Sequence, residues 1–151
     1  KFAGDYPPNI VGLPLYEYKD NLERFIKLAE ITVNWILTHA LSRYHGNKLG
    51  IEGYAFGAKG QVFNIGENTG ILKYKLAEYV ANEINVYAPS EIKKFATGKG
   101  NANKLLMHEA FVEETGSDLT KWFEFDTYTG QSPVSDIIDS YYIAKYCDLN
   151  S

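Results

Sequence analysis

Hydrophobic side chains first recur at helical spacing after Asp20. The apolar set is Leu22, Phe25, Ile26, Ala29, Val33, Ile36, Leu37 and Ala40, and charged residues fill the positions between them. Asp20 and Glu23 can form a capping box at the start, and Gly46 lies just past the expected end. The pattern predicts an amphipathic helix over residues 20–40, preceded by a proline-containing stretch that predicts loop or irregular strand.

A strand, a helix and a second strand are predicted next. Residues 48–56 form a short, largely apolar run followed by Gly57 and Gly60. Helical spacing then extends from Ile65 to Val80, and residues 84–88 form another short apolar run before Pro89. This order predicts a β-α-β unit, which is typical of a sheet covered by helices.

The rest of the chain is expected to be mainly helical. Ser90 can cap a short helix, residues 98–101 form a glycine-rich turn, another helix contains residues 105–112, and residues 120–125 form an ambiguous aromatic segment. Ser132 and Pro133 predict a cap and a first-turn proline for the last helix. Its expected apolar side is Val134, Ile137, Ile138, Tyr141 and Ala144.

Composition restricts the class of protein. The 151 residues are 45% hydrophobic and 23% charged, and they contain no repeat or linker, so one α/β domain over residues 1–151 is expected. A net charge of −4 argues against general polycationic binding to nucleic acid, so any such contact needs a local basic patch. The single cysteine, Cys147, excludes an intramolecular disulfide and a zinc cluster, and it favours a reducing compartment. No apolar run reaches the roughly 18 residues of a membrane span, so we expect a soluble, cytoplasmic protein.

Three acidic residues are candidates for chemistry. Glu52 lies in an apolar strand, where a carboxylate needs a compensating cation unless it simply faces solvent on an edge strand. Asp136 and Asp139 are three positions apart at the start of the last helix and can project toward the same neighbourhood. The pair suits a hard divalent cation, although acids near a helix N-terminus also simply stabilise the helix dipole.

A glycine- and lysine-rich segment is the candidate for phosphate binding. Lys93, Lys94, Lys99 and Lys104 surround Gly98 and Gly100 close to predicted helix starts. The segment lacks the order of a nucleotide P-loop, and a solvated lysine-bearing loop is the alternative interpretation.

The order of these motifs resembles the RuvC family of Holliday-junction endonucleases, within the ribonuclease H-like superfamily. Ile51-Glu52 with Tyr54-Ala55-Phe56 is similar to the family's second acidic motif, and Asp136-Ile-Ile-Asp139 to its closing D-x-x-D. The segment from Pro89 to Lys104 is similar to the family pattern P-x-x-(I/V)-K followed by G-x-G-x-A-x-K and is the most specific match. The resemblance covers roughly residues 20–146 and implies a mixed β-sheet flanked by helices.

The resemblance also implies an activity. It implies an Mg²⁺-dependent endonuclease, with Mn²⁺ as a substitute, that cuts branched DNA as a homodimer, in a bacterial cell or a phage-infected host. Glu52, Asp136 and Asp139 would hold two metal ions that activate water and stabilise the leaving oxygen. Lys104 would neutralise phosphate near the site, and the lysines Lys93, Lys94 and Lys99 would follow the backbone. Tyr54 or Phe56 would stack on an unpaired base, unless these side chains pack in the core.

Two departures from the family pattern leave alternatives open. The family's first aspartate, on its central strand, has no match here, because Asp5 lies in a proline-rich context; we expect that strand upstream of Lys1. The residues after Glu52 also differ from the aromatic spacing of bacterial resolvases. A non-catalytic DNA-binding or recombination-accessory module, or another ribonuclease H-like nuclease, are therefore the alternative hypotheses.

Overall fold

The computed structural model describes residues 19–39, 48–53 and 62–150. The chain folds into two compact units. The tyrosine and phenylalanine at positions 54 and 56, together with Asp5, lie outside the described residues. None of the helices in the described ranges is long and apolar enough to cross a membrane.

The first unit contains the helices α1 (Asn21–His39) and α2 (Val62–Tyr79). The buried residues of α1 are Phe25, Ala29 and Val33, which are four positions apart and therefore share one face. The predicted cap is present in a modified form, because Asp20 accepts a hydrogen bond from the Glu23 backbone at 2.9 Å. The Glu23 carboxylate accepts its bond from the Lys19 backbone at 2.6 Å instead of from Asp20.

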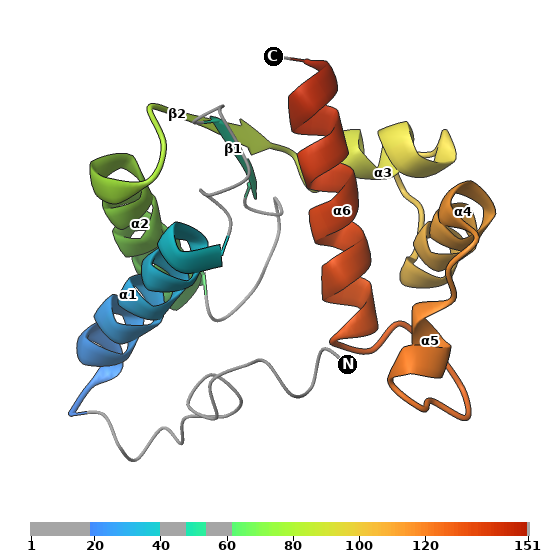
Figure 1. The fold of residues 1–151 in the computed structure, drawn as a ribbon, viewed down its shortest axis with the longest axis horizontal. Helices are drawn as coiled ribbons and strands as arrows, with labels where there is room; N and C mark the ends of the chain where they lie inside the picture. Colours follow the sequence, from blue (N-terminus) through green and yellow to red (C-terminus); the bar gives the residue numbers. More distant parts are fainter. Residues whose placement is uncertain (1–18, 40–47, 54–61, 151) are drawn as a thin grey trace. The chain divides into compact units, whose positions relative to one another are not determined.

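The second unit is built on a two-stranded parallel sheet, β1 (Lys48–Glu52) and β2 (Glu83–Tyr87). The Gly53 backbone N–H donates to the Tyr87 carbonyl at 2.7 Å just past the end of β1. Four helices follow in the chain, and the long C-terminal helix runs past the strands and the shorter helices (Figure 1). They are α3 (Pro89–Thr97), α4 (Lys104–Thr115), α5 (Leu119–Trp122) and α6 (Val134–Leu149).

The hydrophobic core of this unit lies between α6 and the helices before it. Val134, Ile138 and Tyr142 repeat every four residues along α6 and are almost completely buried. They belong to one cluster with Ile92, Ala102, Met107, Phe111 and Leu119. Because the same helix carries Asp136 and Asp139 between these core residues, packing fixes the position of both acids.

The helix α4 is tied to α6 at both of its ends. At the start of α4, the Lys104 ammonium donates to the Ser135 hydroxyl at 2.9 Å. Near its end, Glu114 pairs with Lys145 and accepts a hydrogen bond from the Tyr141 hydroxyl at 2.6 Å. The contacts follow the same order along both helices, so the two ties fix their register.

The predicted elements are present, but three of their details were wrong. Ser90 does not cap α3; Pro89 is its first residue, and the Glu91 carboxylate accepts from the Ala88 backbone at 2.7 Å. The last helix starts at Val134, so Pro133 is the residue before its first turn, and Ser132 bonds to a side chain rather than capping the backbone. Ile137 and Ala144 are exposed, since the buried stripe of α6 follows every fourth residue from Val134.

Candidate nuclease site

The strand β1 directs Glu52 toward α6. Alternate residues of a strand share a face, so Glu52 points to the same side as Gly50. A Cβ atom added at Gly50 would lie 2.8 Å from Ile143 Cγ2 and 3.2 Å from Cys147 Cβ, both on α6. Asp139 is one helical turn before Ile143, so a strand and a helix running in opposite directions bring Glu52 and Asp139 together.

The electrostatics of these carboxylates agree with that placement. The pKa of Glu52 is raised, first by loss of solvation and then by the negative charge of Asp139, with a smaller contribution from Asp136. The pKa of Asp139 is also raised by loss of solvation, and the charge of Asp136 adds to the effect. Glu52 retains substantial solvent exposure as a residue, so this desolvation is partial. The charges of Asp139 and Asp136 therefore reach Glu52 within the second unit.

Two of the four candidate lysines reach the same neighbourhood. The charges of Lys93 and Lys104 lower the pKa values of both Glu52 and Asp139, which opposes the effect of burial. Lys94 and Lys99 are exposed and are not among the charges that influence either carboxylate. The structure thus places Lys93 and Lys104 with the acids, and Lys94 and Lys99 on the surface.

The glycines of the lysine segment allow this arrangement. Gly98 ends α3 with φ of 75°, a left-handed conformation that favours glycine. A side chain at Gly100 would lie 3.2 Å from the Ser90 carbonyl, so the turn packs directly against the start of α3. Asn103 then caps α4 by accepting from the Leu106 backbone at 2.9 Å, which makes Lys104 the first residue of that helix.

Asp136 is held by two serine hydroxyls. Ser135 donates to its Oδ1 atom at 3.1 Å, and Ser132 makes a short hydrogen bond to Oδ2. Both carboxylate oxygens are therefore engaged by neutral donors at the start of α6. Ser132 was expected to cap the helix rather than to bind Asp136, and Ser135 was not singled out, because an isolated serine carries no periodicity or motif that marks it.

Tyr128 is a second residue that the sequence analysis missed. Its hydroxyl is buried and has no hydrogen-bond partner among the described residues. Burial is the main cause of the raised pKa of Tyr128, and the negative charges of Asp139 and Asp136 raise it further. Its ring packs against His108 with centroids 4.8 Å apart. A buried hydroxyl without a hydrogen-bond partner normally lowers the stability of the folded state by about 1–3 kcal/mol. A ligand that bonded to the Tyr128 hydroxyl would remove this loss of stability.

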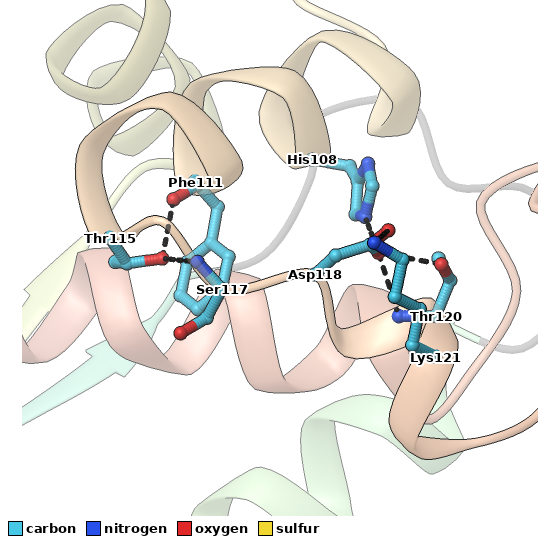
Figure 2. Close-up of polar contacts among 7 residues, drawn as sticks. All are labelled: His108, Phe111, Thr115, Ser117, Asp118, Thr120 and Lys121. Atoms are coloured by element: carbon cyan, nitrogen blue, oxygen red, sulfur yellow. Dashed lines mark hydrogen bonds and ion pairs between the residues drawn. The ribbon is translucent and has the colours of Figure 1, made fainter.

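The histidine that packs against Tyr128 is held in turn by Asp118. His108 Nε2 lies 3.3 Å from Asp118 Oδ1, and this carboxylate also accepts from the Thr120 hydroxyl at 2.6 Å and its backbone at 3.1 Å (Figure 2). Lys121 lies 3.6 Å from the other carboxylate oxygen. The hydrogen bond from Thr120 is the largest cause of the lowered pKa of Asp118. This network joins α4 to α5 and supports the ring of Tyr128.

The chemistry of the acids fits a hard divalent cation. Within residues 19–39, 48–53 and 62–150, no three His, Cys, Asp or Glu side chains are already gathered closely enough to hold a metal ion. Glu52 and Asp139 are nevertheless partly desolvated carboxylates with raised pKa values, and the charge of Asp139 reaches Glu52. Carboxylate oxygens are the protein ligands that Mg²⁺ prefers, and a cation would offset the repulsion between them.

Comparison with known proteins identifies the fold first. The structure matches one described as "Thermus thermophilus RuvC structure" with a TM-score of 0.57 and 13% sequence identity, over 87% of this chain and 72% of that one. The chain therefore has a mixed α/β fold similar to that of the RuvC structure.

The family follows from the sequence comparison. The family model described as "Crossover junction endodeoxyribonuclease RuvC" matches residues 20–113, which are more than half of the chain. The protein belongs to the RuvC family, and this confirms the resemblance found from its motifs. The match includes Glu52, Lys93 and Lys104 but ends before Asp136 and Asp139. A comparison with curated proteins found no match.

Proposed function

We propose that this protein is a metal-dependent endonuclease that resolves four-way DNA junctions by phosphodiester hydrolysis. The observation that supports the proposal most directly is that the charges of Asp139, Asp136, Lys93 and Lys104 all act on Glu52, in a chain of the RuvC family. Acids alone at this place would repel a phosphate. Acids with a metal ion and two lysines would attract one.

Each group has a separate role in the proposal. Glu52, Asp136 and Asp139 would hold Mg²⁺ or Mn²⁺, which when bound supplies an activated water and stabilises charge on the leaving oxygen. Lys104 and Lys93 would bind the phosphate that is cut, because their charges already act on the carboxylates. Lys94 and Lys99, which are exposed, would contact the DNA backbone farther from the cut.

A homodimer is part of the proposal. A four-way junction has pairs of symmetry-related strands, and a two-fold symmetric pair of subunits would present one site to each of two strands. Tyr54 and Phe56 are proposed to stack on bases near the junction centre. Alanine variants at these two positions, tested for base unstacking with a fluorescent base analogue in the junction, examine this role.

Strand scission of a synthetic four-way junction by the full-length protein tests the activity. A linear duplex of equal length is the substrate control, and reactions contain Mg²⁺, Mn²⁺ or a chelator. We expect cutting of the junction with either metal and none in the chelator. Asp139→Asn should abolish cutting, because it removes a metal ligand, and it should preserve or strengthen DNA binding, because it removes a negative charge near phosphate.

The possible results separate the proposal from its rivals. Undiminished cutting by the Asn variant, or cutting in chelator, contradicts the metal mechanism. Binding of the junction without cutting in either metal instead favours an accessory module that retains the fold and the lysines. Equal cutting of the linear duplex and the junction favours another kind of ribonuclease H-like nuclease.

The basic side chains are tested by binding in the chelator, where no cutting interferes. Alanine variants of Lys93, Lys94, Lys99 and Lys104 should each reduce the slope of log affinity against log salt concentration by about one if the lysine contacts phosphate. Junction and duplex should weaken alike, because phosphate contacts carry no sequence information. Unchanged slopes in all four variants reject these lysines as the phosphate contacts.

A further inference from the structure

The hydrogen bonds at the start of α6 form a directed chain from a lysine to an acid. Lys104 donates to Ser135 Oγ at 2.9 Å, and Ser135 donates to Asp136 Oδ1 at 3.1 Å. An ammonium group can only donate and a carboxylate can only accept, so the direction of both bonds is fixed. The serine hydroxyl has one hydrogen, and it must point to Asp136 while the oxygen accepts from Lys104.

Ser135 is buried although it is polar. Only 3% of its surface is exposed, and it is the buried polar residue among the otherwise apolar core positions of the described chain. It lies next to Val134, which is fully buried in the hydrophobic cluster. Core packing therefore fixes the Ser135 backbone, and the hydroxyl has little freedom to leave its two partners.

The stem of Lys104 is confined as well. Gly130 has φ of 97°, and a Cβ atom added there would lie 2.8 Å from Lys104 Cβ and 3.1 Å from its Cδ. The backbone at Gly130 thus covers the aliphatic part of the lysine, while Asn103 fixes its helix start. Long lysine side chains normally have many rotamers, so confinement at the stem and at the ammonium group selects one of them.

We infer that Ser135 is a positioning residue that couples the phosphate-binding Lys104 to the metal-binding Asp136. The inference rests on the proposed function for the roles of these two groups, but the hydrogen-bond chain itself does not depend on it. Ser135 holds the ammonium group near the acids before DNA arrives and orients one oxygen of Asp136. Ser132 holds the other oxygen of the same carboxylate from the preceding loop.

A substitution at Ser135 separates positioning from charge. Ser135→Ala removes both hydrogen bonds but leaves the charges of Lys104 and Asp136 intact. Ser140→Ala is the matched control, because Ser140 is on the same helix and its hydroxyl donates only to the Ile137 carbonyl in the backbone, at 2.9 Å. Lys104→Ala removes the charge itself and provides the comparison for DNA binding.

Two measurements on the full-length protein test the inference. The first uses calorimetry to measure the affinity for Mn²⁺ without DNA. We expect Ser135→Ala to weaken this affinity by about 10-fold, the lower end of the usual effect of residues that orient metal ligands. Ser140→Ala should change it less than about 2-fold. The second is the salt dependence of junction binding in chelator. Ser135→Ala should keep the wild-type slope, whereas Lys104→Ala should lower it by about one.

Single-turnover cutting of the junction completes the test. We expect Ser135→Ala to slow it by about 10- to 100-fold at saturating DNA, with Ser140→Ala close to the wild type. If the wild-type protein binds Mn²⁺ and does not cut, the proposed function fails, while weaker Mn²⁺ binding by Ser135→Ala still supports the coupling. Mn²⁺ affinity of Ser135→Ala equal to that of Ser140→Ala, or no Mn²⁺ binding by the wild type, overturns the inference.

Discussion

Adding one methyl group at Gly50 should separate β1 from α6. A Cβ atom there would lie 2.8 Å from Ile143 Cγ2, whereas carbon atoms in good contact are about 3.5–4.0 Å apart. The overlap is therefore roughly 0.7 Å or more. Ile143 is β-branched and rigid at χ1, and the Ile143 carbonyl is 3.2 Å from the same point. Neither neighbour can turn aside, so α6 must shift.

The expected cost in stability has two opposing parts. Overpacking of this kind usually costs about 1–3 kcal/mol. Replacing a strand glycine by alanine raises the free energy of unfolding by about 0.5–1 kcal/mol, because alanine loses less backbone entropy on folding. We therefore expect Gly50→Ala to lower the free energy of unfolding by about 0–2.5 kcal/mol. Because the shifted contact adjoins Glu52 and Asp139, cutting of the junction should fall more than the folded fraction does.

Urea unfolding followed by circular dichroism measures the effect. Gly70→Ala on α2 is the control, since no atom lies within 4 Å of a Cβ added there, and it should gain about 0.5–1 kcal/mol. In an Ile143→Ala background the cost of Gly50→Ala should be at least halved, because the overlapping methyl group is gone. A Gly50→Ala variant as stable as Gly70→Ala would refute the close packing of α6 on β1.

Three other predictions concern titration and burial. Glu52→Gln and Asp139→Asn should each stabilise the metal-free protein at neutral pH, because folding raises the pKa of both carboxyls and so disfavours their charged forms. Unfolding in chelator measures this gain in stability. The gain should disappear as the pH falls below the ordinary pKa values of 4.5 for Glu52 and 3.8 for Asp139. The hydrogen bond from Lys145 lowers the pKa of Glu114, so the stability that Glu114 contributes is present above pH 4.5 and is lost as pH falls through its lowered pKa; Glu114→Gln should show a flatter acid-unfolding curve. Tyr128→Phe should raise the free energy of unfolding by about 1–3 kcal/mol, because it removes a buried hydroxyl that has no partner among the described residues. A loss of stability would instead show that the hydroxyl is bonded in solution.

Local sequence signals predicted the elements because each signal depends on neighbouring residues. The four-residue repeat of Phe25, Ala29 and Val33 gave α1, and the glycine–lysine motif gave the turn before α4. Local context made the three acids and Lys104 candidates, and the family resemblance, whose motifs keep their order along the chain, then implied a role for each. Their meeting could not come from spacing alone, since it depends on how β1 packs against α6.

The errors in the prediction also have physical causes. Ser90 has the chemistry of a helix cap, but the proline before it already occupies the first helical position. The burial of Ser135 was invisible in the sequence, because hydrophobic periodicity assigns a serine to the solvent face. Tyr128 has a neutral side chain in an irregular segment, so neither charge nor periodicity marked its place near the acids.

The two ties between α4 and α6 make the position of Lys104 dependent on a distant contact. Lys104 and Glu114 are ten residues apart, which corresponds to about 15 Å along a helix. A rigid helix that slides at one end slides equally at the other, so loss of the Glu114 contacts with Lys145 and Tyr141 frees axial motion at the lysine. Changes at the far end of α4 are therefore expected to shift Lys104 without touching it, so the surface around Glu114 is coupled mechanically to the start of the helix.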